Sequence, residues 1–217
     1  MTDRFFLETR DPLKFIGWLW PNERLYDKEV ELILSVKNNI KTNVVSANKM
    51  GKDYTGGLIC VGAFLNPAAF LLADGEPAPP LRSRDMPNVK IITTSVKDEH
   101  LDNLWGEMDR LLATAKYPLT ADKGGPLNYL HREIRRVTRN GEQFDSFVKA
   151  QVSAKGEVLA GHHADYTLLV GDEASALDDK VLEFSQGWAK RFMFIGNPHQ
   201  CTNFYFRDSE AGNLEMP

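Results

Sequence analysis

Apolar and polar residues follow two different rhythms along this chain. Short apolar or β-branched runs predict strands over residues 42–45, 89–94, 166–171 and 191–195. Longer stretches carry apolar residues every three or four positions. This spacing predicts amphipathic helices from Pro21 or Asn22 to Lys37 and from Lys97 to Ala115. Strands that alternate with helices are typical of an α/β domain whose central sheet is mostly parallel.

Two segments depart from this alternation. Gly56 and Gly57 lie inside a predicted buried helix that runs to Leu65, and we expect them to let this helix approach the sheet closely. Residues 66–88 contain many prolines, which break regular structure, and they are therefore predicted to form a long surface insertion.

A β-hairpin is predicted where Asn140-Gly141 separates two strand-like runs, 127–137 and 144–152, because this dipeptide favours a tight turn. The hairpin carries a cluster of arginines: Arg132, Arg135, Arg136 and Arg139. The cluster fits a solvated basic strand, or it contacts phosphate on a DNA backbone or on a neighbouring subunit's nucleotide.

The chain has 217 residues, of which 42% are hydrophobic and 26% charged, and this composition suits an ordinary α/β domain. No run approaches the ~18 apolar residues of a membrane span, and the N-terminus lacks a signal-peptide pattern. Cys60 and Cys201 are too few for a disulfide framework or a zinc site, so we expect a cytoplasmic protein without a membrane partner. The net charge of −4 argues against a dedicated nucleic-acid module, but not against a motor with a local basic patch.

Residues 41–54, KTNVVSANKMGKDY, carry the strongest chemical signal. A predicted strand runs into a loop that ends in Gly-Lys and continues as a helix, which is the context of a phosphate-binding loop. Backbone N–H groups would cradle the anion, Lys52 would reach the β- and γ-phosphates, and Gly51 would keep side-chain bulk away. The candidate nucleotide-binding residues are Ser46, Ala47, Asn48, Lys49, Met50, Gly51, Lys52, Asp53 and Tyr54.

This loop departs from the pattern G-x-x-x-x-G-K-[ST] at two positions. Ser46 replaces the first glycine, and Asp53 replaces the hydroxyl residue that normally contacts Mg²⁺. A carboxylate also binds Mg²⁺, so Asp53 is a candidate metal ligand, although its charge would lie beside the phosphates. The alternative is that Gly-Lys only provides the turn at which a helix begins.

Two later strands are each followed by polar residues. Asp172 and Glu173 come directly after the strand 166–171, and open α/β sheets bind ligands at the carboxyl ends of their strands. Asp172 would hold Mg²⁺, and Glu173 would act as the general base that activates a water molecule. Asn197 follows the strand 191–195 and would sense the γ-phosphate, unless it is only a turn residue before proline.

Two weaker candidates lie outside these blocks. Tyr26 is a candidate platform for adenine, although the aromatic residues in this part of the chain fit core packing better. His162, His163 and Asp165 are close in sequence, but adjacent side chains of an extended segment point apart. We therefore expect a loop that contacts the sheet edge here rather than a metal site.

In combination, these blocks resemble the ATPase domain of the large terminase subunit, the motor that packages phage DNA. VVSANKMGKDYTGG (44–57) resembles the Walker A motif of that family, and VKIITTSVKDEHLDNLWGEMDRLL (89–112) resembles the strand and helix that follow it. GEVLAGHHADYTLLVGDEASALDD (156–179) resembles its Walker B strand and acidic pair. FMFIGNPHQCTNFYF (192–206) resembles its coupling motif. The resemblance covers residues 25–206.

The resemblance implies a three-layer P-loop NTPase fold with a mostly parallel sheet, of the additional-strand, catalytic-glutamate class, with the β-hairpin as an insertion. It implies that ATP and Mg²⁺ bind, with Lys52 on phosphate and Asp172 on the metal. Glu173 would then activate water, and Asn197 would couple hydrolysis to movement. It also implies a homo-oligomeric ring that works with a portal protein and a small terminase subunit to drive double-stranded DNA into a procapsid in the host cytoplasm.

This chain differs from the family pattern within Walker A, and the resemblance covers only part of the chain. The family often places an arginine in Walker A, where this chain has Asn48 and Lys49, so a neighbouring subunit is the alternative source of an arginine. We expect residues 1–24 to be an N-terminal segment and 25–206 to be the P-loop core. The chain ends soon after the third block, so we expect no nuclease domain and no DNA cleavage.

Two other functions stay open. One is a different P-loop NTPase, such as a helicase-like translocase. The other is a nucleotide-binding structural protein that does not hydrolyse its ligand, which the missing Walker A hydroxyl permits.

Overall fold

The computed structural model describes residues 9–46, 51–78, 87–137, 143–152, 159–197, 202–209 and 214–216. One sheet contains the strands β1 (Lys41–Ser46), β2 (Val89–Thr94), β3 (Leu127–Leu130), β4 (Glu133–Val137), β5 (Gln143–Ala150), β6 (Tyr166–Gly171), β7 (Arg191–Gly196) and β8 (Leu214–Met216). The helices are α2 (Pro12–Leu19), α3 (Asp27–Asn38), α4 (Lys52–Leu65), α5 (Pro67–Phe70), α6 (Leu101–Thr114), α7 (Asp179–Gln186) and α8 (Phe204–Ser209). Short 3₁₀ helices are η1 (Asp98–His100), η2 (Ala121–Lys123) and η4 (Ala174–Ala176).

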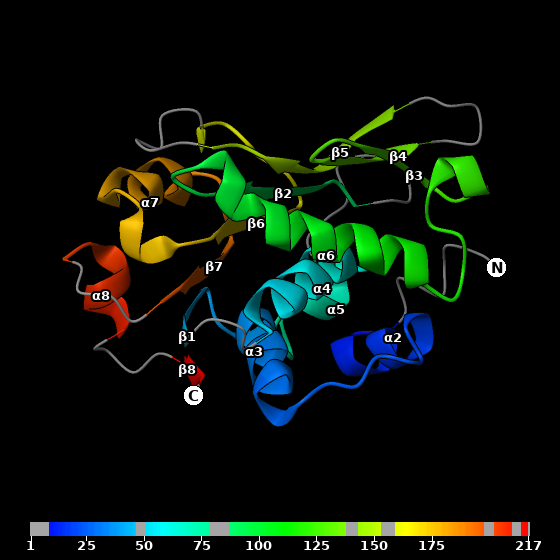
Figure 1. Cartoon of the computed structure of the whole chain (residues 1–217), viewed down its shortest axis with the longest axis horizontal. Coiled ribbons are helices and arrows are strands. Elements are labelled where there is room, and N and C mark those ends of the chain that lie inside the picture. The colour runs from blue at the N-terminus through cyan, green and yellow to red at the C-terminus, as the bar shows by residue number, and fades with distance from the viewer. Residues whose placement is uncertain are drawn as a thin grey trace.

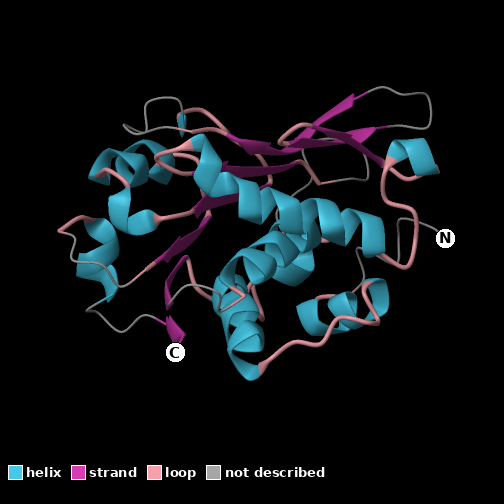
Figure 2. Ribbon diagram, viewed as in Figure 1, coloured by secondary structure: helices cyan, strands magenta, loops and turns pink. Residues whose placement is uncertain are grey.

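The sheet lies between two layers of helices (Figure 1). Apolar side chains of β1, β2, β6 and β7 pack on α3, α4 and α6 on one face, where α2 and α5 complete the larger core. Side chains of the opposite face, among them Leu169 and Phe194, pack on η4, α7 and α8 in a smaller core. Figure 2 shows helices on both sides of the strands. The predicted three-layer α/β fold is confirmed.

The strand order is β3-β4-β5-β2-β6-β7-β1-β8. In this order, each strand from β5 onward is parallel to the next: β5, β2, β6, β7, β1 and β8. At the other end of the sheet, β3 pairs with β4 and β4 with β5 in antiparallel fashion. β7 therefore lies between β1 and β6 and is the additional strand that the terminase resemblance implied. The antiparallel pairing of β4 and β5 confirms the predicted hairpin, although Asn140-Gly141 itself lies outside the described residues.

Three sequence predictions about element boundaries are wrong. The run 127–137 is two strands, β3 and β4, because the chain turns at Arg132, whose φ is +55°. The helix expected from Pro21 or Asn22 begins at Asp27, and Tyr26 is its N-cap residue. A hydrogen bond of 2.9 Å from the Tyr26 backbone N–H to Glu29 stabilises this start.

The third error concerns residues 66–88, which were expected to form a surface insertion. Their first part is α5, in which Phe70 is buried, and Leu71 and Leu72 after it are buried as well. A Cβ built on Gly62 of α4 would lie 2.3 Å from Cζ of Phe70, so the aromatic ring needs a glycine beneath it. Proline at the start of α5 suits the first turn of a helix and does not signal a loop here.

Gly56 lets α4 approach the sheet as predicted, whereas Gly57 faces α6. A Cβ on Gly56 would lie 3.0 Å from Cδ1 of Leu104 in α6 and 3.2 Å from Cδ1 of Ile195 in β7. A Cβ on Gly57 would lie 3.3 Å from the backbone nitrogen of Met108. Helix α4 therefore lies close to both the sheet and α6.

The arginines of the hairpin bind their own chain. Arg132 forms ion pairs with Asp98 and Asp102 beside the start of α6. Arg135 pairs with Glu133 and lies over the ring of Phe147. Arg136 is buried, donates to the last carbonyls of α4, on Phe64 and Leu65, and lies over the Phe64 ring. A freely solvated basic strand does not describe these three, whereas contact with phosphate stays a prediction. Arg139 lies outside the described residues.

His162 is part of a loop that contacts the sheet, as expected. Its Nε2 lies 2.9 Å from Oε1 of Gln151, just after β5, and its ring packs edge-on against Phe147 and Trp188. The carboxylate of Asp165 accepts a hydrogen bond of 2.9 Å from the backbone N–H of Asn88. Within the described residues, no helix is both long and apolar enough to cross a lipid bilayer.

Candidate functional site

The topology brings the separate sequence blocks to one edge of the sheet. β1, β7 and β6 are parallel neighbours, so their carboxyl ends point the same way. Helix α4 begins after β1 with Lys52, Asp172 follows β6, and Asn197 follows β7. Lys52, Asp172 and Asn197 are 5%, 4% and 8% exposed. Three polar groups from distant parts of the sequence are thus buried together, where each needs a partner.

A chain of hydrogen bonds joins them. The Lys52 ammonium donates to Oδ1 of Asn197 at 2.8 Å. Nδ2 of Asn197 donates to Oε1 of Glu173 at 3.5 Å, and the Glu173 backbone N–H donates to Oδ1 of Asp172 at 2.9 Å. The lysine predicted to bind phosphate and the glutamate predicted to activate water are therefore linked through one asparagine.

The phosphate-loop candidates are described only in part. Gly51 is the N-cap of α4 with φ at +76°, a left-handed conformation that favours glycine. Ser46 is the last residue of β1, and Asp53 lies in the first turn of α4. The candidates outside the described residues are Ala47, Asn48, Lys49 and Met50.

Acidic groups crowd this edge. Burial, together with the negative charges of Asp53 and Glu173, raises the pKa of Asp172 to about 7, against the opposing effects of the Glu173 backbone N–H and of Lys52. Burial also raises the pKa of Asp53; Lys52 opposes this shift, while Glu173 and Glu107 add to it. A cation bound here would relieve this repulsion.

Asp172 and Asp53 fit a Mg²⁺ site by their chemistry. Mg²⁺ prefers oxygen ligands and is commonly held by one or two carboxylates together with substrate phosphates and water. Among the described residues, no three His, Cys, Asp or Glu side chains form a metal-binding group of their own. The two acids would therefore hold Mg²⁺ as part of a metal–nucleotide complex.

Glu173 adopts an unusual backbone conformation. Its φ of +49° and ψ of +47° place a residue with a large side chain in the left-handed region. This conformation costs on the order of 1 kcal/mol or more and persists only where the surroundings hold it. The hydrogen bond from its backbone N–H to Asp172 and the one that its carboxylate accepts from Asn197 fix Glu173 in place.

Glu29 is a residue of this region that the sequence reasoning missed. It is 5% exposed, and a Cβ on Gly51 would lie 2.8 Å from its Oε1. The other carboxylate oxygen accepts from the backbone N–H of Tyr26, so Glu29 joins the start of α3 to the start of α4. A glutamate three residues after an N-cap position is a recognisable helix-start pattern, and this was the available signal.

The two tyrosine candidates differ in their surroundings. The Tyr26 side chain is 78% exposed, so the structure gives no support to a core role for it. Tyr54 donates from its hydroxyl to Glu23 at 2.9 Å, and Arg110 lies over its ring. Burial and the negative charge of Glu23 raise the pKa of Tyr54 well above its usual value. Nucleotide contact by either residue stays a prediction.

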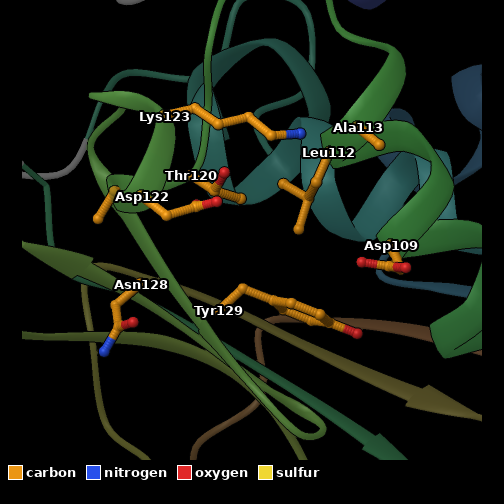
Figure 3. Close-up of a pocket in the computed structure, with 9 residues that line it drawn as sticks. Asp109, Leu112, Ala113, Thr120, Asp122, Lys123, Asn128 and Tyr129 are labelled. Atoms are coloured by element: carbon orange, nitrogen blue, oxygen red, sulfur yellow. The ribbon is translucent and has the colours of Figure 1, made fainter.

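A cavity of ≈ 300 Å³ lies elsewhere, between α6, η2 and β3. Figure 3 shows Lys123 and Tyr129 on opposite sides of it. It shares no residue with the Lys52–Asn197–Glu173 chain. The sheet edge is the stronger candidate site, because buried polar groups converge there and burial raises the pKa of the Asp172 and Asp53 carboxyls.

Solved structures provide a comparison for this fold. The ATPase domain of the large terminase of Thermus phage P74-26 matches with a TM-score of 0.57 and 13% identity, over 89% of this chain and 72% of that chain. The large terminase of bacteriophage HK97 matches with a TM-score of 0.55 and 13% identity, over 86% of this chain and 37% of that chain. This chain has the fold of a large terminase ATPase domain.

A large terminase of a thermophilic bacteriophage, solved in complex with ADP, matches with a TM-score of 0.50 and 7% identity. The match covers 88% of this chain and 45% of that chain, so this chain spans less than half of that protein. No protein-family model and no curated protein matches this chain. The terminase likeness therefore defines the fold, and the roles of site residues depend on their geometry in this chain.

Proposed function

We propose that this chain is an ATPase motor domain that drives double-stranded DNA into a phage procapsid. The observation that carries the proposal is the buried chain of contacts from Lys52 through Asn197 to Glu173, beside Asp172, at the carboxyl edge of three parallel strands. This is the arrangement that ATP hydrolysis requires: a cation for the phosphates, an acid for the metal and a base for the water.

Each residue has a distinct role in this proposal. Lys52 binds the β- and γ-phosphates. Asp172 and Asp53 hold Mg²⁺, which when bound neutralises charge on the phosphates. Glu173 orients a water molecule and accepts its proton, and Asn197 couples hydrolysis to movement.

The proposed partners follow from the terminase resemblance. They are double-stranded DNA, further copies of this chain in a ring, a portal protein and a small terminase subunit, in the host cytoplasm. The terminase solved with ADP supports nucleotide binding by this fold, and on that ground we propose ATP as the ligand of this chain.

The direct test is Glu173→Gln, which keeps the size of the side chain and removes its basicity. We expect ATP binding to be retained and phosphate release to be lost, by about 100-fold or more for a general base. Glu183→Gln, an exposed position on α7, is the matched control and should leave both unchanged. Turnover by Glu173→Gln at the wild-type rate would contradict the proposal.

A second function is favoured by Asp53. A carboxylate replaces the Walker A hydroxyl and raises negative charge beside the proposed phosphates. A nucleotide-binding protein that does not hydrolyse ATP would follow if this charge displaced Mg²⁺. Wild-type protein that binds ATP without hydrolysing it, even with double-stranded DNA present, would favour this second function, and Asp53→Ser should then restore hydrolysis.

A further inference from the structure

Asn197 uses both ends of its side-chain amide. Its carbonyl oxygen accepts from the Lys52 ammonium, and its amide nitrogen donates to the Glu173 carboxylate. The amide dipole is thus aligned between a cation and an anion, with the negative end toward Lys52. Such a charge-assisted contact is stronger at a buried site than in water.

The surroundings of Asn197 favour a fixed position for this amide. Its side chain is 8% exposed, and it follows directly after β7, a central strand. Pro198 comes next in the sequence and restricts the backbone of Asn197 to extended conformations. A turn asparagine typically bonds to nearby backbone, whereas both described hydrogen bonds of Asn197 go to side chains more than 20 residues away.

Lys52 depends on this contact. Among the described residues, Asn197 is the hydrogen-bond partner of its ammonium group. An ammonium has three protons, so one bond to Asn197 leaves two for phosphate oxygens. A long, flexible lysine side chain loses less freedom on binding phosphate when one of its protons is already held.

We propose that Asn197 is a positioning residue that holds Lys52 for the β-phosphate, in addition to any contact with a γ-phosphate. This inference rests on the proposed nucleotide site and assigns a different role to Asn197 within it. If Asn197 only sensed the γ-phosphate, its loss would change the binding of ATP and not that of ADP. A residue that positions Lys52 affects ADP as well, because ADP retains the β-phosphate.

ADP affinity measured by calorimetry separates the two roles. Removing a hydrogen bond to a charged group corresponds to about a tenfold change, so Asn197→Ala should weaken ADP binding about tenfold. In a Lys52→Ala background the same change should have no further effect, because the group that Asn197 holds is gone. ADP affinity that is unchanged in Asn197→Ala, or a tenfold loss that persists without Lys52, would overturn the inference.

Two further variants control for indirect effects on the site and for loss of folding. Asn203→Ala removes hydrogen bonds to the backbone of Ala174 and Leu177, next to Glu173 but not to Lys52, and should leave ADP affinity unchanged. If Asn197→Ala does not fold, Asn197→Ser provides the same test with a smaller loss of packing.

Wild-type protein that binds neither ATP nor ADP would refute the proposed function itself. Wild-type binding with an unaffected Asn197→Ala would refute only this inference.

Discussion

The antiparallel hairpin and the parallel edge of the same sheet use charge in opposite ways. In the hairpin region, β3 to β5, Arg132 and Arg135 have acidic partners and Arg136 binds the end of α4. At the carboxyl edge of β6, Asp172 lies near the acidic groups of Asp53 and Glu173, and Lys52 opposes their charge. Paired charge supports the fold, whereas crowded charge of one sign marks a place that a ligand can complete. The number of charged residues in a segment does not distinguish these cases.

The largest effect that tests this comparison is expected at Asp172. Its pKa is raised in the folded state from 3.8 to about 7, so the folded protein holds a proton there that the unfolded chain has released. The free energy of unfolding should therefore fall as pH rises from about 4 to about 7 and then level off. Asp172→Asn should remove this contribution and stabilise the metal-free protein at pH 8 by up to about 4 kcal/mol.

Urea unfolding between pH 5 and pH 8 in the presence of a chelator measures this difference. Asp109→Asn, at an exposed position of α6, is the matched control and should show the wild-type pH dependence. Parallel pH profiles for wild type and Asp172→Asn would show that the carboxylate is not destabilising in the folded state.

Lys52→Ala removes the cation that opposes the acidic groups among the described residues of this edge. Two charge-assisted bonds to phosphate would be lost, so ATP and ADP should bind about 100-fold more weakly in calorimetry. Lys180→Ala removes an exposed lysine of α7 and should have no effect. Equal nucleotide affinity for wild type and Lys52→Ala would remove the parallel edge as the phosphate site.

Arg136→Ala tests the hairpin side of the comparison. The buried guanidinium satisfies carbonyl groups at the end of α4, so its loss should lower the free energy of unfolding by about 2 kcal/mol. Nucleotide affinity should stay at the wild-type value. Arg207→Ala breaks an exposed ion pair with Asp179 and should cost about 0.5 kcal/mol. A loss of ATP binding in Arg136→Ala with normal stability would indicate a ligand contact instead.

The smallest effect concerns the helix that carries Lys52. Gly56→Ala places a methyl group 3.0 Å from Leu104, and we expect a loss of about 1 kcal/mol of stability despite the better helix propensity of alanine. Gly106→Ala on α6 has no atom within 4 Å of its new Cβ and should stabilise by about 0.5–1 kcal/mol. A lower melting temperature for Gly56→Ala and a higher one for Gly106→Ala would confirm that α4 is tightly packed. A change in the same direction for both variants would contradict it.

Sequence reasoning succeeded where the pattern repeats over a whole element. Strand β2 has the predicted ends, and the predicted apolar stripe of α6, including Leu104 and Met108, is buried. Helix α6 follows from its periodicity, since one face lies on the core, whereas β2 is buried on both faces and follows from its short β-branched run. The convergence of Lys52, Asp172 and Asn197 was also anticipated, because residues that follow parallel strands share an edge.

Several of the errors concern residues whose environment is set by contacts between different elements of the fold. Arg136 has the sequence character of an exposed residue, but its partners are carbonyls more than 70 positions away. Phe70 is buried against Gly62 in a segment that prolines made look like a loop. Glu29 reaches Gly51 across a boundary between two helices. The sequence around Arg136 and Phe70 does not show these partners, and for Glu29 it shows only the helix-start pattern.

The position of β7 also has a consequence for synthesis of the protein. β7 enters between β1 and β6, strands that the ribosome has already released, and Asn197 comes 145 residues after Lys52. The central sheet is discontinuous until that late segment is inserted. A nascent chain that ends before β7 has no continuous sheet to align Lys52 with Asp172, so the proposed nucleotide site would form only when nearly the whole domain has emerged.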